Sequence, residues 1–204
     1  MSGSYFFPST FALHAFWVVY YFWIIAEFGV WYLAGRHKTG AVKKGDRGSV
    51  WIVFLGIFVA VGFAFIFRGA GLGLLPAWVE WPGLALMLLG IVLRSWSILL
   101  LGRFFSVRVE MQAGHQVVTA GPYRYIRHPA YTGSMITLAG MGLALGSWVG
   151  ALLIVVIFRV VYSYRVRVEE SFLLSSLGEE YRAYMEGTGR FVPRWPAFRR
   201  NRVG

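Results

Sequence analysis

The sequence predicts an all-α integral membrane protein with five transmembrane helices and a cytoplasmic C-terminal helix. Hydrophobic residues make up 57% of the 204 residues, whereas charged residues make up only 14%. A soluble domain averages roughly 25% charged residues, and a chain of this length has too little interior to bury so much apolar surface. The apolar residues also gather into five runs, and most Lys and Arg residues lie between those runs.

The apolar runs give the expected helices. They are Phe11–Ala34, Val50–Phe67, Trp81–Leu101, Tyr131–Leu145 and Trp148–Tyr162. The first three are close to the ~20 residues that cross a bilayer core. The last two are shorter, and together they are too long for one crossing, so we expect a helical hairpin over about 131–162 that turns at Gly146.

Basic residues alternate with the crossings. Five basic residues oppose one Asp in the loop Gly35–Ser49, and four Arg residues oppose one Glu in residues 102–130. The loop Arg68–Glu80 and the turn at Gly146 carry almost no net charge. The positive-inside rule places the N-terminus outside and the two basic loops and the C-terminal tail in the cytoplasm. We therefore divide the chain into three N-terminal transmembrane helices (1–101) and a second region with the hairpin and tail (102–204). The candidates for chemistry fall mainly in the first loop of this second region and in the tail, on one side of the membrane.

Several classes of site are absent from the sequence. The chain has no Cys, which excludes disulfides, thiolate metal sites and a Cys nucleophile. The four His residues lack metal-ligand spacing, so no metal is expected. No GxGxxG follows a strand-like run, and no basic groove with aromatic platforms suggests nucleic acid. The first residues show no basic n-region and no cleavage site, so we expect no signal peptide.

The segment Gly121–Gly133, GPYRYIRHPAYTG, is the densest in polar and aromatic residues. Pro129 suits the first turn of a helix, and His128 and Tyr131 then share one helix face. A helix N-terminus can seat a carboxylate, so a ligand with a carboxylate, an aromatic base and a cation would fit here. An interfacial aromatic belt with snorkelling Arg residues explains the same composition.

Charged residues elsewhere form two further groups. Arg165 and Glu169 lie four residues apart just beyond the last apolar run, on one face of a tail helix that ends near Gly187 and Gly189. Glu27, Arg94 and Arg159 lie inside apolar runs, where a charge costs roughly 2.5–3.5 kcal/mol on insertion scales. Each of these three is explained equally by a structural pair or snorkelling and by substrate contact, and Arg94 is the candidate for an anionic lipid.

These residues resemble the isoprenylcysteine carboxyl methyltransferase family, including its short prokaryotic members. The resemblance extends from about Leu101 to Pro193. Its ordered motifs are Gly114-His115, Val117-Val118-Thr119, Gly121-Pro122-Tyr123, Arg127-His128-Pro129-Ala130-Tyr131 with Gly133, then Arg165, Glu169-Glu170, Leu173, Gly178-Glu179-Glu180-Tyr181, Tyr184 and Val192-Pro193. The N-terminal helices match only as apolar segments.

The resemblance implies methyl transfer from S-adenosylmethionine to a membrane-soluble, lipid-like acceptor, such as the carboxylate of a prenylated cysteine. It assigns catalytic roles to Arg165 and Glu169 and binding of the acceptor to Arg165, and Arg94 is a second candidate for binding the acceptor. Either Arg108 or Gln112 would complete the cofactor site. The cofactor contacts that it implies are His115, Gln116, Val117, Val118, Tyr123, His128, Pro129, Ala130, Tyr131 and Glu169.

Other functions remain open at this stage. Phospholipid and thiol methyltransferases use the same fold type, and fold does not fix function. A membrane reductase would need a site for the 2′-phosphate of NADPH, which Arg190 and Arg194 could supply. A non-enzymatic membrane scaffold would need no ligand site at all. The expected partners are the bilayer and a lipid-like acceptor, with no metal and no nucleic acid.

Overall fold

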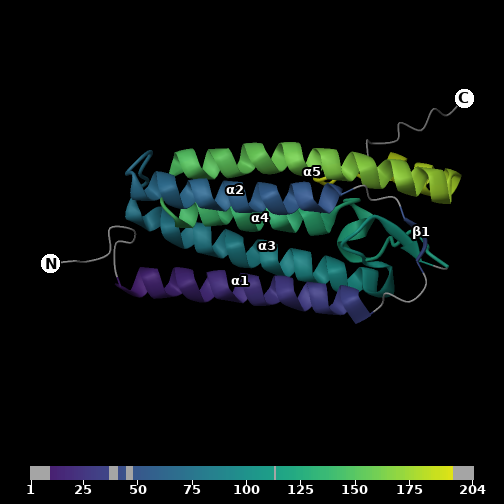
Figure 1. The fold of residues 1–204 in the computed structure, drawn as a ribbon, viewed down its shortest axis with the longest axis horizontal. Helices are drawn as coiled ribbons and strands as arrows, with labels where there is room; N and C mark the ends of the chain where they lie inside the picture. Colours follow the sequence, from purple (N-terminus) through teal and green to yellow (C-terminus); the bar gives the residue numbers. More distant parts are fainter. Residues whose placement is uncertain (1–9, 37–40, 45–47, 113, 195–204) are drawn as a thin grey trace, which may run out of the picture.

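A computed structural model describes residues 10–36, 41–44, 48–112 and 114–194, and the elements form an elongated helical bundle (Figure 1). The helices are α1 Thr10–Arg36, α2 Ser49–Gly69, α3 Glu80–Leu101, α4 Pro129–Ala144, α5 Trp148–Leu177 and α6 Glu179–Gly187. Short 3-10 helices span Ala77–Val79, Gly102–Phe104 and Gly121–Arg124. Each of the five expected apolar runs forms a helix, and the predicted turn contains Gly146 with a φ of 69°.

The tail helix differs from its prediction. The last apolar helix does not stop at Tyr162 but continues to Leu177, because nothing in the charged stretch after Tyr162 interrupts helical backbone. Gly178, with a φ of 58°, ends α5, and α6 then runs to Gly187. The expected helix end near Gly187 is therefore confirmed, whereas the break at Gly178 was not predicted.

A small β-sheet makes the fold mostly helical rather than all-α. Strand β1, Ala41–Lys44, pairs antiparallel with β2, Glu110–Gln112. Strands of four and three residues are too short to show an alternating hydrophobic pattern, which is why the sequence did not reveal them. The sheet fastens the segment between α1 and α2 to the segment between α3 and α4.

Small residues bring α3 and α4 into close contact. A Cβ added at Gly133 would lie 2.7 Å from the Arg94 backbone nitrogen, and one at Gly140 would lie 2.6 Å from the Gly83 carbonyl oxygen. Gly90 and Gly83 on α3 meet α4 in the same way, at Thr137 and Ala144. Such small-residue contacts are a common basis of helix packing in membranes. They hold α4, whose N-terminus carries His128 and Tyr131, in the centre of the bundle.

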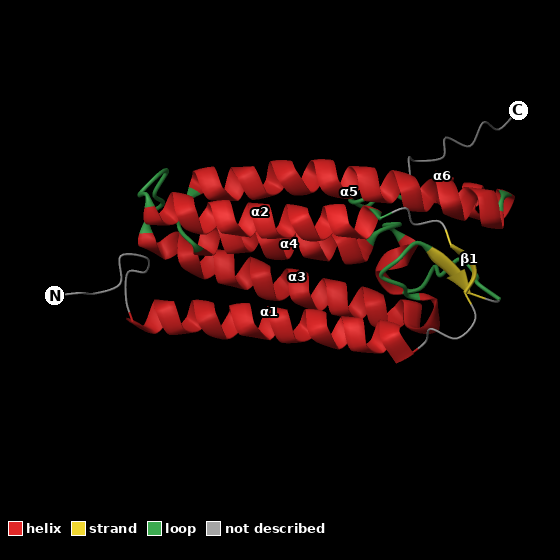
Figure 2. Cartoon of the chain, viewed as in Figure 1, coloured by secondary structure: helices red, strands yellow, loops and turns green. Residues whose placement is uncertain are grey.

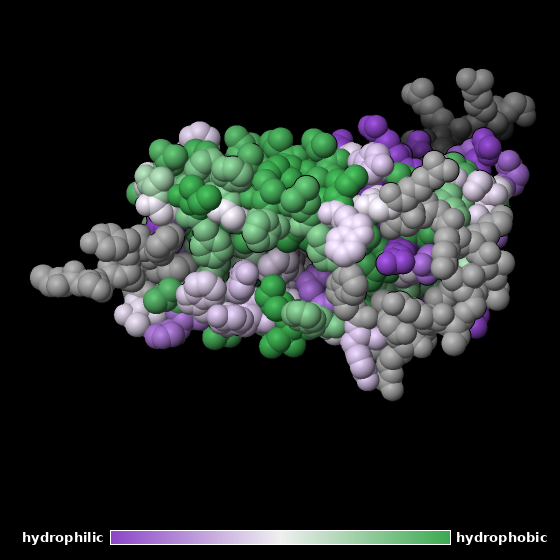
Figure 3. Space-filling view, viewed as in Figure 1, coloured by the Kyte–Doolittle hydropathy of each residue, from purple (hydrophilic) through white to green (hydrophobic). Residues whose placement is uncertain are grey.

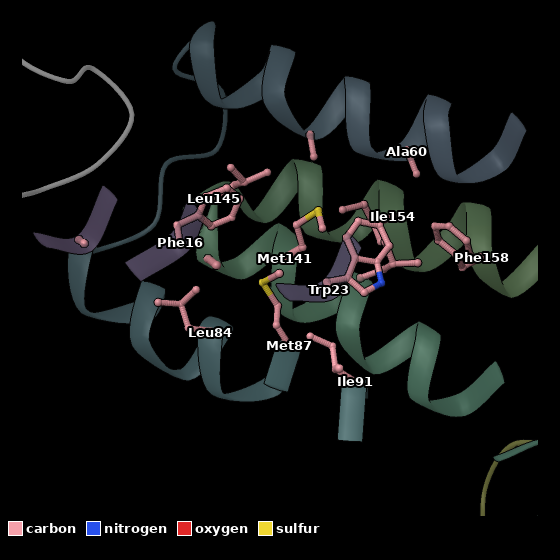
Figure 4. Packing of buried hydrophobic residues seen from close by; sticks show 14 of the residues in the cluster. Phe16, Trp23, Ala60, Leu84, Met87, Ile91, Met141, Leu145, Ile154 and Phe158 are labelled. Atoms are coloured by element: carbon pink, nitrogen blue, oxygen red, sulfur yellow. The ribbon is translucent and has the colours of Figure 1, made fainter. Parts of the chain in front are cut away.

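The packed interior lies among α1–α5, where Phe16, Trp23, Met87, Met141 and Phe158 are buried (Figure 4). The visible outer face of these helices is strongly hydrophobic, whereas the end that carries α6 is hydrophilic (Figure 3). Within the described ranges, α1, α2, α3 and α5 are long and apolar enough to cross a membrane. At 16 residues, α4 is about 24 Å long, shorter than a ~30 Å hydrocarbon core.

One end of the bundle gathers the polar connections. The N-termini of α2 and α4 and the C-termini of α3 and α5 lie there with the β-sheet and α6 (Figure 2). The opposite end holds the α2–α3 connection and the turn at Gly146. The predicted convergence of the chemistry-bearing segments at one end is confirmed.

Candidate active site

A cavity of about 190 Å³ opens at the polar end of the bundle. Its walls come from all six α-helices and from the loop between α3 and α4. The predicted residues in the wall are Arg94, Arg108, His115, Val117, Val118, Tyr123, His128, Ala130, Tyr131, Arg165 and Glu169. Gln116 is exposed and Pro129 is fully buried at the start of α4, and neither lines the cavity. The Gln112 side chain lies outside the described part of the chain, whereas Arg108 is in the wall.

Arg165, Tyr131 and Glu169 form one connected polar group. The Tyr131 hydroxyl donates to Glu169 Oε2 over 2.8 Å and accepts a hydrogen bond from Arg165 Nε over 3.2 Å. The Arg165 guanidinium also donates to the Val107 carbonyl over 2.7 Å and to the Ser49 hydroxyl. Arg165 is almost completely buried, so these contacts fix its orientation from α2, α4 and the α3–α4 loop.

His128 lies between two carboxylates. Its Nε2 is 3.3 Å from Glu170 Oε1, and its Nδ1 is 3.8 Å from Glu169 Oε1. The rings of His128 and Tyr131 stack with centroids 5.8 Å apart, which confirms that they share one face at the start of α4. The imidazole therefore connects the exposed side of the site, at Glu169, with the buried Glu170.

Glu170 is a structural anchor that the sequence analysis did not assign. Its buried carboxylate accepts a hydrogen bond from Arg127 Nε over 2.9 Å and another from the Arg190 guanidinium. Arg127 also donates to the Met185 carbonyl over 2.8 Å and to that of Thr188. The sequence did contain a signal for this second role. Glu169 and Glu170 are adjacent on a helix, so their side chains point about 100° apart and meet different surroundings.

The tail returns to the site after α6. The Arg127 amide donates to the Gly189 carbonyl over 2.8 Å, and the His128 amide donates to the Arg190 carbonyl over 3.2 Å. The two Arg residues considered for a 2′-phosphate are engaged here: Arg190 on Glu170, and Arg194 on the Glu186 carbonyl over 2.7 Å. The aromatic and basic residues 195–204 lie outside the described residues.

The α3–α4 loop supplies an unsatisfied polar atom to the wall. Among the described residues, His115 Nδ1 is buried and has no hydrogen-bond partner, while the ring contacts Phe104 at 4.9 Å between centroids. Burial lowers the pKa of His115, so the imidazole is neutral near pH 7. Burial raises the pKa of Tyr184 to about 12, and its hydroxyl donates to the Tyr123 carbonyl over 2.7 Å. A neutral heteroaromatic ligand such as a nucleobase would suit this polar and aromatic surface.

Two of the three charges inside the apolar runs pair with each other. Arg94 donates two hydrogen bonds to Glu27, Nε to Oε1 over 2.6 Å and Nη2 to Oε2 over 2.9 Å. Arg159 is exposed on α5 and contacts Ser163 one turn further on. Glu27 and Arg94 thus form a structural ion pair, which was one of the two interpretations of these charges, and both residues also line the cavity.

The sequence that builds this site was compared with models of known protein families. Residues 83–175 match the model of the isoprenylcysteine carboxyl methyltransferase (ICMT) family, and these residues include Arg127, His128, Tyr131, Arg165 and Glu169. Through this region, which is a little under half of its length, the chain is similar to the isoprenylcysteine carboxyl methyltransferase family. The predicted family resemblance is confirmed, and the matched residues build the polar half of the cavity.

Several curated proteins that are similar to this chain are named methyltransferases. The Schizosaccharomyces pombe protein-S-isoprenylcysteine O-methyltransferase is 34% identical over 55% of this chain and 49% of its own length. The Arabidopsis thaliana protein-S-isoprenylcysteine O-methyltransferase A is 32% identical over 57% of this chain and 60% of its own length. The chain thus spans about half to three fifths of the curated relatives that it matches.

A solved ICMT structure has the same arrangement of helices. The eukaryotic intramembrane Ras methyltransferase ICMT superimposes with a TM-score of 0.56 at 28% sequence identity, over 74% of this chain and 54% of that structure. With the four long apolar helices, this likeness identifies the chain as an integral membrane protein.

Proposed function

We propose that the chain is a methyltransferase that uses S-adenosylmethionine and methylates a lipid-like acceptor, with the carboxylate of a prenylated cysteine as the model acceptor. One observation carries the proposal: a single cavity brings Arg165 and Glu169 from α5 together with Tyr131 from α4. Similarity to the family supports methyl transfer as the reaction, since the two relatives above carry that activity in their names.

The residues present fit the proposed methyl donor. His115 offers an unsatisfied buried nitrogen, and Tyr123, Val117 and Val118 lie with it in the wall. The Glu169 carboxylate, 27% exposed, would attract the cationic part of the cofactor. A charge that favours the cationic ground state helps binding rather than rate, so Glu169 is assigned to cofactor binding and to holding Tyr131.

The chemistry requires mainly positioning. S-adenosylmethionine, when bound, would supply an electrophilic methyl group, whose carbon an acceptor oxygen can attack in line while the thioether sulfur of S-adenosylhomocysteine leaves with the electron pair. An acceptor carboxylate is already a nucleophile, so the site needs no general base. Arg165 would orient that carboxylate by charge-assisted hydrogen bonds, and orientation alone can contribute roughly 7–11 kcal/mol. Ser49, Val107 and Tyr131 keep the guanidinium in place for this role.

We also propose the orientation in the membrane. The five helices α1–α5 cross the bilayer, with α4 enclosed by its neighbours, and the basic loops and α6 lie in the cytoplasm. In this orientation the methyl donor enters from the cytosol. A lipid-like acceptor reaches the same cavity from the bilayer.

The activity can be tested directly with labelled S-adenosylmethionine and a prenylated N-acetylcysteine in detergent micelles. Arg165→Lys should reduce kcat/KM by about tenfold or more, because Lys lacks the planar fork that binds a carboxylate through two bonds. Arg167→Lys is the matched control, since Arg167 is exposed on the same helix. Absence of transfer by folded wild-type protein would contradict the proposed acceptor, and equal rates for the two variants would contradict the role of Arg165.

A further inference from the structure

The ion pair between Glu27 on α1 and Arg94 on α3 lies in the wall of the cavity. Its two hydrogen bonds, 2.6 and 2.9 Å long, occupy Nε and Nη2 of the guanidinium. Arg94 Nη1 lies 3.4 Å from the Ala130 carbonyl oxygen at the start of α4. The two side chains are 17% and 26% exposed, so both still border open space.

The surroundings of the pair are apolar. Trp23 and Val30 from α1, Val50 and Val53 from α2, and Leu138 from α4 line the same cavity. At the far end of the bundle α1 meets α2 through aromatic contacts, with the rings of Phe16 and Phe65 6.2 Å apart. Toward the polar end the two helices instead bound the cavity. The part of the cavity that these five residues line, here called its membrane-facing part, therefore suits an apolar chain.

Glu27 changes what Arg94 can bind. Nε and Nη2 form one edge of the guanidinium fork, which is an edge that grips a phosphate or carboxylate through two parallel bonds. In the structure this edge is filled by a carboxylate of the protein itself. The pair carries no net charge toward the cavity, whereas Arg94 without Glu27 would present a cation to an arriving lipid.

We propose that Glu27 is a specificity-determining residue: by occupying Arg94 it keeps lipids with a phosphate headgroup out of the membrane-facing part of the cavity. The sequence alone had made Arg94 a candidate for binding an anionic lipid, and the geometry reverses that role. The inference rests on the proposed function only in that a lipid-like acceptor uses this cavity. It also implies that the acceptor segment lying beside α1 and α2 is an uncharged chain.

The test compares two single-chain lipids with the same acyl chain, a monoacylglycerol and a monoacylglycerol phosphate. Binding of each to the purified full chain in neutral detergent is measured by native mass spectrometry, without methyl donor. Glu27→Gln should increase binding of the phosphate lipid relative to the neutral lipid by about tenfold, the scale of a hydrogen bond to a charged group. Glu27→Asp, which is one methylene shorter, should give a smaller increase in the same direction.

Two controls separate this effect from a change in overall charge or in folding. Glu179→Gln removes the same charge from an exposed pair with Arg182 on α6 and should leave the lipid ratio at the wild-type value. The double variant Glu27→Gln/Arg94→Gln should lose the gain, because the exposed cation is gone. Binding of S-adenosylhomocysteine, followed in parallel, reports whether each variant still forms the cofactor side of the cavity.

The outcomes are distinct. A wild-type lipid ratio in folded Glu27→Gln or Glu27→Asp, or a gain that persists in the double variant, would overturn the proposal and leave the pair as a link between α1 and α3. A shifted lipid ratio in a protein that transfers no methyl group would contradict the proposed function and keep this inference.

Discussion

At the scale of single residues, the Tyr131 hydroxyl joins the two charged groups of the site. It accepts a hydrogen bond from Arg165 and donates one to Glu169, so it links the residue proposed to bind the acceptor to the residue proposed to bind the cofactor. Tyr131→Phe keeps the ring and its stacking on His128 but removes both bonds. Hydrogen bonds to charged groups contribute about 1.5–3 kcal/mol each, so we expect kcat to fall by about tenfold or more.

The Tyr131→Phe measurement is steady-state methyl transfer with the apparent melting temperature recorded beside it. Tyr164→Phe is the control, because Tyr164 is an exposed Tyr on α5. An unchanged kcat in a well-folded Tyr131→Phe protein would show that the hydroxyl does not position Arg165.

His115 gives the site a pH dependence. Burial lowers the pKa of His115 from 6.5, so the unfolded chain takes up a proton at a pH where the folded chain does not. The stability that His115 contributes is therefore complete above pH 6.5 and falls as the pH drops through that value toward the folded pKa. We expect the apparent melting temperature to fall between pH 7 and pH 5.5 by less in His115→Gln than in the wild type. Parallel curves for the two proteins would contradict this.

At the scale of elements, the contact between α3 and α4 depends on glycine. Gly140→Ala places a Cβ 2.6 Å from the Gly83 carbonyl oxygen and the Met87 amide nitrogen, so the backbones must separate. Overpacking of this kind costs about 1–3 kcal/mol. Gly62→Ala on α2, where a Cβ meets nothing within 4 Å, should preserve stability or raise it slightly. Thermal unfolding of the two variants tests this, and equal melting temperatures would refute the close contact.

Sequence reasoning predicted elements better than their contacts. Apolar runs gave the five helices α1–α5, four of which are long and apolar enough to cross a membrane, and Gly146 gave the turn between α4 and α5, because run length and glycine are local signals. Two helix boundaries were missed. The sequence changes from apolar to charged after Tyr162, but α5 continues through that change to Leu177, and a single glycine such as Gly178 inside a helical pattern does not by itself indicate a helix end. The β-sheet was too short to leave a pattern, and the Glu27–Arg94 pair joins residues 67 positions apart. No single-sequence signal separates such a pair from two substrate contacts.

For the site, too, sequence reasoning predicted residues in local motifs but not residues whose roles depend on contacts between distant segments. The motif residues His128, Tyr131, Arg165 and Glu169 were predicted and do converge on one cavity. Ser49 and Glu170, which hold Arg165 and Arg127, were not assigned because their roles arise from packing between distant segments. Gln116 and Pro129 fall within the motif run but do not line the cavity, since a contiguous run cannot direct every side chain to one side.

At the scale of the whole molecule, all polar connections of the site lie at one end, and the basic loops predict that this end is cytoplasmic. The chain has no Cys, so single-cysteine variants can report accessibility without background. A membrane-impermeant maleimide should label Ala70→Cys in intact cells and Thr119→Cys only after lysis, because the two exposed positions lie at opposite ends of the bundle. The reverse pattern would invert the proposed topology.

The cavity also depends on the complete bundle. Trp23, Glu27 and Ser49 precede residues 83–175, and Tyr181 follows them, yet all four line the cavity or hold a residue that does. The boundary at residue 101, expected to separate anchoring helices from the catalytic region, therefore does not separate wall residues.

The most direct test of the account is calorimetric titration of S-adenosylhomocysteine into the detergent-purified chain. Wild type and Glu179→Ala, which removes an exposed carboxylate, should bind one equivalent saturably. Glu169→Ala and His128→Ala should bind about tenfold more weakly or not at all, since each removes a polar group from the cavity wall. Wild-type affinity in both site variants, or no binding of S-adenosylhomocysteine or S-adenosylmethionine by folded wild type, would contradict the assignment of this cavity to the methyl donor.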